Sequence, residues 1–363
     1  MVVTPPSANV RAAGAPRNPG PSWGFQFLRL GDRVLPEVVY RPLRALGTAI
    51  ALAGMPAQRQ HSRAYLATVL DRPPTWRDVF RHFFAFEEAL MLKLRLANGQ
   101  TVPCDFAPSG QAFCDWLATG GPVLLGTMHV GVSDMLGFQL GGQINPARTP
   151  QPSDLGETPM PRLPAVPGGT GVPPVGLDRK ASAGVKRRVY LVRQRVGNSY
   201  DTERLAARFG EWLRFIWVND AGEMLFALKT AAATGDAIAL QCDRVEFTTR
   251  TEAFDFLGAR RLFPITIYHL ARIFDRPVIL TVGLPAPAGR SRLYGSPRFD
   301  PVPGEPRGAA AERAHEHFQD FLRQVEGLLR AQPYLWFNFT PLNPPAPAGA
   351  PLREPPSIKF RGI

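Results

Sequence analysis

A histidine and an aspartate stand five residues apart, directly after a short apolar run. The run Val123–Met128 predicts a buried strand, His129 follows it, and Asp134 comes where the next helix is expected to begin. A carboxylate at that distance can fold back onto the imidazole, fix its tautomer and stabilise the imidazolium formed when the ring takes a proton. Gly131 between them allows a tight turn. The spacing predicts a general base. A structural histidine at a strand end is the alternative, since such a pair also occurs by chance.

A second polar group follows another apolar run. Ala237–Leu240 predicts a strand, and Asp243 and Arg244 come just beyond its end. An arginine there can hold a phosphate or carboxylate through its planar guanidinium. The alternative is an Asp243–Arg244 pair with purely local partners. Cys242 could be proposed as a nucleophile, but no base is paired with it in the sequence.

The motifs of other enzyme classes are missing from the sequence. There is no GxSxG elbow, no GxxxxGK[ST] loop and no GxGxxG fingerprint. Three cysteines without CxxC spacing and six scattered histidines predict neither a disulfide scaffold nor a structural zinc site, so no metal is expected and a reducing compartment fits best. The first 21 residues lack the apolar core of a secretory signal.

The segments that must position these side chains alternate between two patterns. Continuous apolar runs, typical of strands buried on both faces, occur at Val189–Val192, Phe215–Val218, Ala237–Leu240 and Val278–Val282. Helical patterns separate or follow them, at Thr202–Arg214, Glu223–Ala233, Pro264–Phe274 and Ala309–Ala331. This alternation predicts the α/β class, with a mostly parallel central sheet flanked by helices. In such a sheet, ligands bind beyond the carboxyl ends of the strands.

The region before Ala97 reads as helical, including Arg63–Leu70 and Trp76–Leu96, the latter with Thr75 as its N-cap and Asp78 three residues on. Its first part interleaves apolar with basic residues: Trp23, Phe25, Phe27, Leu28, Leu35, Val38, Val39 and Leu43 with Arg29, Arg33, Arg41 and Arg44. That pattern fits amphipathic helices in a membrane interface, and equally fits core-facing helices with solvated arginines. No stretch reads as a transmembrane span, because glycine, proline or charge interrupts each apolar run.

Composition gives the domain limits and the classes of partner. Of the 38 prolines, 21 fall in residues 1–22, 146–174 and 341–356. We therefore expect a disordered tail over 1–21, one domain over 22–342 with a poorly ordered insertion at about 143–187, and a loose tail over 343–363. The formal charge of +12, from 42 basic and 30 acidic residues, favours an anionic partner. No nucleic-acid-binding motif is present, which leaves an anionic membrane surface or an acidic substrate.

Several of these segments together resemble one family. The order and spacing of five blocks are similar to those of the lysophospholipid acyltransferase superfamily, in particular its lipid A late (lauroyl/myristoyl) acyltransferase branch. His129 and Asp134 match its His-x4-Asp/Glu motif, although many lipid A enzymes have Glu at the second position. The remaining blocks are Trp23–Arg29, Arg77–Phe83, Asp243-Arg244 with Phe256–Ala259, and Trp336–Phe339.

The resemblance implies transfer of a fatty acyl group from an acyl carrier protein or coenzyme A thioester to a hydroxyl or amine of a lipid or glycolipid. No other cofactor is implied, and the enzyme would work at the cytoplasmic face of the inner membrane. His129 and Asp134 would be catalytic, and the substrate-binding residues would be Asp243, Arg244, Gly258, Arg260 and Arg261. Two alternatives stay open: a catalytically silent lipid-binding protein of the same fold, and an esterase or thioesterase.

Overall fold

A computed structural model of the chain describes residues 22–133, 137, 188–194, 209–218, 221–245, 248 and 250–342. Several sequence predictions lie outside these ranges: the tails over 1–21 and 343–363, the insertion at 143–187, the position of Asp134 and most of the predicted helix Thr202–Arg214. The fold is described below for the remaining residues.

The centre of the fold is a mixed sheet with the strand order β1-β9-β8-β2-β5-β3-β4. Its strands are β1 (Cys104–Phe106), β2 (Leu124–Gly131), β3 (Val189–Arg193), β4 (Leu213–Trp217), β5 (Ala237–Gln241), β8 (Val278–Ala286) and β9 (Arg290–Gly295). Neighbouring strands are parallel except for β8 and β9, which are antiparallel. This confirms the predicted α/β class with a mostly parallel sheet.

Most apolar runs of the sequence became the inner strands β2, β3, β5 and β8, because a strand covered on both faces needs apolar side chains on both. The run Phe215–Val218 became β4, at the edge of the sheet. The strands that the sequence analysis missed, β1, β9 and the hairpin of β6 (Thr251–Phe256) and β7 (Ala259–Pro264), have mixed polarity. In β9, for example, exposed Arg290 and Arg292 alternate with buried Ser291 and Leu293.

Two predicted helices include residues that belong to strands, and the helix predicted over Arg63–Leu70 begins earlier, at Pro56. Leu213 and Arg214 belong to β4 rather than to a helix, because Leu213 is buried in the sheet next to β3. Pro264 ends β7, and the following helix begins only at Thr266.

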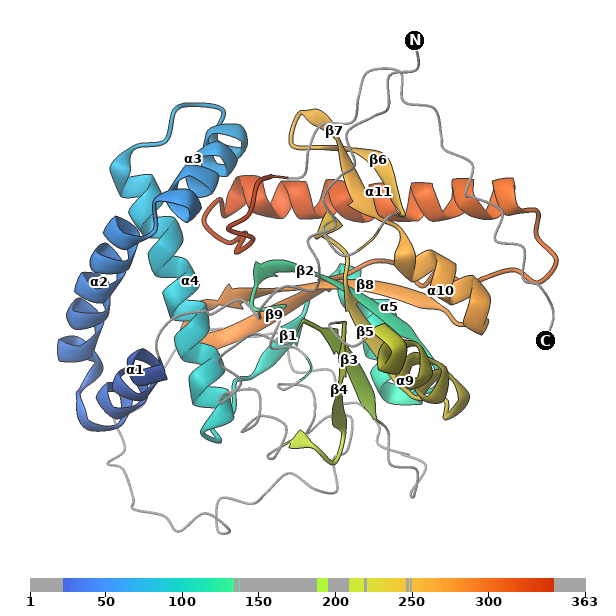
Figure 1. Ribbon diagram of the computed structural model, residues 1–363, viewed down its shortest axis with the longest axis horizontal. Helices are drawn as coiled ribbons and strands as arrows, with labels where there is room; N and C mark the ends of the chain where they lie inside the picture. The colour runs from blue at the N-terminus through green and yellow to red at the C-terminus, as the bar shows by residue number, and fades with distance from the viewer. Residues whose placement is uncertain are drawn as a thin grey trace.

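Helices cover both faces of the sheet (Figure 1). The helices of the described residues are α1 (Ser22–Val34), α2 (Glu37–Gly54), α3 (Pro56–Leu70), α4 (Trp76–Ala97), α5 (Gln111–Thr119), α9 (Ala221–Ala233), α10 (Thr266–Phe274) and α11 (Arg307–Ala331). Of these, α1 and α2 pack on other helices. The main core joins side chains of α3, α4, α9, α10 and α11 to one face of the sheet. A second core packs α5, through Phe113 and Trp116, against the other face.

Helix α4 begins with the cap that the sequence predicts. The Thr75 hydroxyl accepts a hydrogen bond from the Asp78 N–H, and the Asp78 carboxylate accepts one from the Thr75 N–H. This capping box satisfies two backbone donors at the helix start. It fixes the first turn of a helix that reaches the functional site described below.

Helix α2 is polar on its inner face and apolar on its outer face. Arg44 is only 5% exposed and pairs with Glu87 of α4 at 2.8 Å. Val38 and Ile50 of the same helix are 85% and 67% exposed. Tyr40 and Leu52 of α2 are buried in the core, but Val38 and Ile50 do not face it, and buried Arg44 is not a solvated arginine. Within the described residues, no helix is both long and apolar enough to cross a membrane.

Candidate functional site

His129 and Asp243 meet at the edge of the sheet, although 114 residues separate them in the chain. The His129 Nδ1–H donates to Asp243 Oδ1 at 2.8 Å, and the His129 backbone N–H donates to Oδ2 at 2.8 Å. The Asp243 side chain is fully buried, while that of His129 is 12% exposed. Because the carboxylate accepts from Nδ1, the other ring nitrogen, Nε2, is left as the basic atom. Among the described residues no hydrogen-bond partner of Nε2 is found.

The topology of the sheet explains this meeting. Strands β2 and β5 are parallel neighbours, with Thr127 paired to Gln241. His129 and Asp243 each come two residues after that pair. The Cys242 N–H also donates to the Thr127 carbonyl at 2.7 Å, which extends the pairing to the site. Two residues that follow adjacent parallel strands at equal distances must lie side by side.

His129 lies inside its strand rather than after its end, where the sequence analysis placed it. Strand β2 continues to Gly131 because Leu335–Phe337, hereafter the C-terminal strap, pairs with it. Val130 and Trp336 form an antiparallel bridge, and the Phe337 N–H donates to the His129 carbonyl at 2.7 Å. The backbone of the candidate base is therefore held by hydrogen bonds on both its N–H and its carbonyl.

Gly131 makes the tight turn that the sequence predicts. Its φ is +55°, and a Cβ at this position would collide with the carbonyl oxygen of Gly283. Both observations require glycine there. Ser133 closes the turn, because its hydroxyl donates to the Val130 carbonyl at 2.5 Å and accepts from the Gly283 N–H at 2.9 Å.

The predicted Asp243–Arg244 local pair is not what the described contacts show. Asp243 contacts His129, and the Arg244 Nε–H donates to Asn338 Oδ1 at 3.1 Å. The Thr340 hydroxyl donates to the same Asn338 oxygen at 2.9 Å. Arg244 is thus held beside the site through its Nε, which leaves the two terminal nitrogens of the guanidinium to bind an anion. Sequence reasoning missed Asn338 as a partner of Arg244.

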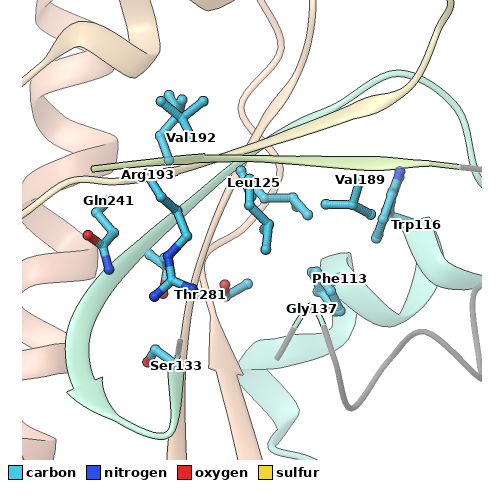
Figure 2. Close-up of a pocket in the computed structure, with 14 residues that line it drawn as sticks. Phe113, Trp116, Leu125, Ser133, Gly137, Val189, Val192, Arg193, Gln241 and Thr281 are labelled. Atoms are coloured by element: carbon cyan, nitrogen blue, oxygen red, sulfur yellow. The ribbon is translucent and has the colours of Figure 1, made fainter. Parts of the chain in front are cut away.

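A pocket lies on the same side of the sheet (Figure 2). Its cavity has a volume of about 70 Å³ and is partly open to solvent. Thr127 and Gln241 line it, two residues before His129 and Asp243 respectively, so the pocket borders the His129–Asp243 pair. Its wall is mostly apolar, formed by Phe113, Trp116, Leu125, Val189, Leu191, Val192, Ala239 and Leu240. The polar lining residues are Thr127, Ser133, Arg193, Gln241 and Thr281.

Three predicted substrate-binding residues lie on the β6–β7 hairpin. Gly258, with φ +74°, forms its turn, Arg260 is exposed on β7, and the Arg261 Nε–H donates to the Phe256 carbonyl at 3.2 Å. Burial lowers the pKa of Arg261. The hairpin touches the C-terminal strap, since the rings of Phe256 and Trp336 lie 5.2 Å apart. Arg260 donates to the Ala253 carbonyl at 3.5 Å, so its described contact lies within the hairpin and not at the His129–Asp243 pair.

The candidate nucleophile Cys242 lies on the other face. Its thiol is in the main core, and burial raises its pKa to about 12, which keeps it protonated at neutral pH. The described ranges also contain no group of three His, Cys, Asp or Glu side chains that could hold a metal ion. The chemistry of the site therefore has to be argued from His129, Asp243 and Arg244.

No protein-family model and no curated protein sequence matches this chain. Among solved structures, the chain is similar to the crystal structure of the 1-acyl-sn-glycerophosphate (LPA) acyltransferase PlsC from Thermotoga maritima. The sequence identity is 12% and the TM-score 0.32, over 79% of this chain and 96% of that chain. A likeness this loose says nothing about function.

Proposed function

We propose that the protein transfers a fatty acyl group from a thioester donor to a hydroxyl or amine of a lipid or glycolipid, with His129 as general base. The observation that carries the proposal is the His129–Asp243 pair: an imidazole with a buried carboxylate on Nδ1 and a free Nε2, at the carboxyl end of a parallel strand. That arrangement stabilises the imidazolium formed during proton transfer.

Direct attack by the acceptor fits the described residues around His129. Cys242 is buried on the opposite face, and Ser133 uses its hydroxyl in two backbone hydrogen bonds. In the proposed step, Nε2 takes the acceptor proton while the acceptor oxygen or nitrogen bonds to the thioester carbonyl carbon. The carbon–sulfur bond then breaks, and the imidazolium returns the proton to the thiolate. No acyl-enzyme forms.

The apolar pocket is a suitable place for the acyl chain. Gln241 lies at one end of the pocket, and Phe113 and Trp116 of α5 lie toward the other end (Figure 2). Gln241 is two residues before Asp243 in the chain. A chain in this pocket would have its carbonyl near His129 and its methylenes against apolar side chains. Burial of each methylene stabilises binding by about 0.8 kcal/mol.

Arg244 is our candidate for binding a phosphate, either of the acceptor or of the donor's pantetheine arm. Asn338 fixes the Nε edge of the guanidinium, and a fixed planar donor suits a phosphate. Asp134 would assist His129, while Gly258, Arg260 and Arg261 would contact substrate from the hairpin. No metal or prosthetic group is needed, and the donor is an acyl carrier protein or coenzyme A thioester.

A membrane surface is the proposed place of work, at the cytoplasmic face of the inner membrane. The outer surface of α1 and α2, hereafter the apolar face, exposes a run of large side chains: Phe27, Leu30, Val34, Val38, Val39, Leu43, Leu46 and Ile50. Water disfavours such a contiguous patch, whereas the apolar part of a lipid interface accepts it. The acceptor would then reach the site from the lipid, and a glycolipid of the lipid A type is the finer proposal.

The test is acyl transfer from acyl-carrier and coenzyme A thioesters into an envelope lipid extract, read by mass spectrometry. Wild type, His129→Gln and the control His61→Gln, on α3, are compared with and without the extract. A new acylated lipid made by wild type and His61→Gln, but not by His129→Gln, supports the proposal. Thioester hydrolysis without acceptor, abolished in His129→Gln, would instead indicate a thioesterase. No turnover by any protein would favour the silent lipid-binding protein.

A further inference from the structure

We infer that His82 of helix α4 is a positioning residue for His129 and acts through one peptide group of the C-terminal strap. The inference rests on the proposed role of His129 as the base. The ring nitrogens of His82 bond to Ser62 and to the Trp336 carbonyl, not to His129. Its influence travels through the peptide that joins Trp336 to Phe337.

That peptide group is hydrogen-bonded at both ends. Its carbonyl, on Trp336, lies 2.6 Å from His82 Nε2, and its N–H, on Phe337, donates to the His129 carbonyl at 2.7 Å. Hydrogen bonds in such a series polarise one another, because each peptide dipole is aligned with the next. The position of His82 therefore sets the position of the group that holds the His129 backbone.

The protonation state of His82 follows from its partners. A carbonyl can only accept, so Nε2 carries the hydrogen, and Nδ1 accepts from the Ser62 hydroxyl at 2.8 Å. The ring is 1% exposed and packs against Tyr65 and Phe339, with centroids 5.3 and 4.7 Å away. Burial lowers its pKa to about 4, so it stays neutral at neutral pH and keeps this tautomer. Every polar atom of the ring is then satisfied.

Helix α4 holds the chain around the strap at a second point. The Tyr334 hydroxyl donates to Asp78 Oδ1 at 2.8 Å. Asp78 and His82 are four residues apart, so they lie one above the other on the same face of the helix. Asp78 binds the side chain of Tyr334, and His82 binds the backbone carbonyl of Trp336. The helix is thus a rigid support for the C-terminal strap, and it also contacts α2 through the Arg44–Glu87 pair.

The matched control is a second histidine with the same bonding pattern. His317 of α11 contacts the Tyr268 hydroxyl through Nδ1 at 2.6 Å and the Pro297 carbonyl through Nε2 at 2.8 Å. The described partners of the Pro297 carbonyl are Ser296 and His317, and neither belongs to the C-terminal strap. Replacing His317 therefore removes a hydroxyl–imidazole–carbonyl chain without touching the C-terminal strap.

The experiment compares His82→Leu, His82→Gln and His317→Leu in the full chain. Two quantities are measured: kcat and KM for acyl transfer, and the NMR signals of the His129 imidazole, including its Nδ1–H. We expect His82→Leu to lower kcat by about 10- to 100-fold with KM nearly unchanged, since a displacement of about 1 Å at a reacting group costs up to about 100-fold. The His129 signals should shift in the same variant.

His82→Gln should recover most of the kcat and most of the wild-type His129 signals, because the glutamine amide can donate to the Trp336 carbonyl. His317→Leu should leave kcat and the His129 signals unchanged. If His82→Leu does not fold, Ser62→Ala keeps the ring but removes the donor on Nδ1, and should shift the His129 signals in the same direction. The inference is overturned if His129 gives wild-type signals in folded His82→Leu or, failing that, in Ser62→Ala. The NMR measurement needs no turnover, so it tests whether His82 positions His129 even if the proposed acyl transfer fails.

Discussion

Both carboxylate oxygens of Asp243 bind one residue, His129: one oxygen accepts from the ring and the other from the backbone N–H. A single side chain thereby fixes the tautomer of the imidazole and the position of the strand that carries it. Because Asp243 is fully buried, its two acceptor oxygens need these donors, and the geometry has little freedom. Asp243 makes the contact that the sequence led us to expect from Asp134.

The first prediction separates the two aspartates. Asp243→Asn should lower kcat by about 10²–10⁴-fold, the usual contribution of general-base catalysis, because the amide cannot accept at both oxygen positions and disturbs the tautomer. Asp134→Asn should lower kcat by a smaller factor. Steady-state kinetics of both, with Asp255→Asn on the exposed side of β6 as the control, checks this. A larger loss for Asp134→Asn would show that Asp134 orients the base.

The second prediction concerns Arg244. Arg244→Ala should raise KM for a phosphate-bearing substrate by roughly 10-fold or more, since a hydrogen bond to a charged group contributes about 1.5–3 kcal/mol. Asn338→Ala should raise KM less, because it only frees the guanidinium that it holds. Arg298→Ala is the control, since Arg298 forms an exposed surface pair with Asp300. Equal KM values for Arg244→Ala and wild type would remove Arg244 from the substrate site.

The third prediction concerns the acyl pocket. Ala239→Phe would place a ring in the pocket from β5, so kcat/KM should fall more for long than for short acyl thioesters. Each methylene that is excluded lowers binding by about 0.8 kcal/mol. Competition between short and long donors measures the preference directly. Ala309→Phe, on an exposed turn of α11, controls for the added bulk. An unchanged preference would place the acyl chain elsewhere.

The fourth prediction concerns the apolar face. The double variant Val38→Glu/Ile50→Glu should lose binding to vesicles that contain anionic lipid, as measured by flotation. Wild type should stay bound in high salt, because apolar side chains point outward and salt screens only charge interactions. Leu225→Glu/Phe226→Glu is the matched control, since both residues are exposed on α9. Release of wild type by salt alone would indicate electrostatic binding instead.

The fifth prediction concerns stability and pH. The pKa of His82 is about 4 in the folded protein and near its ordinary 6.5 in the unfolded chain. Between these pH values the unfolded chain binds the proton and the folded protein does not, so the free energy of unfolding falls as pH falls. The full loss amounts to roughly 3 kcal/mol. Urea unfolding at several pH values should show a weaker acid dependence for His82→Gln than for wild type. Parallel profiles would contradict the low pKa.

The sequence by itself determined the class of fold and one half of the candidate site. The apolar runs predicted β2, β3, β4, β5 and β8, because strands buried on both faces have a composition that can be read locally. The same pattern placed His129 at the carboxyl edge of the sheet. Thr75 and Asp78 predicted the start of α4, since a capping box spans only four residues. Each of these features depends on near neighbours in the chain.

The tertiary structure alone decided which carboxylate faces His129, which strap holds it and which side of α2 points outward. Asp243 is 114 residues from His129, and the His82–Trp336 contact spans 254 residues. Such contacts depend on strand order and register, which local patterns do not encode. Helix periodicity likewise separates an apolar from a polar face but does not say which one is buried. In α2, Arg44 turns inward because it pairs with the carboxylates of Glu37 and Glu87. The side chains of the apolar face are then left outside.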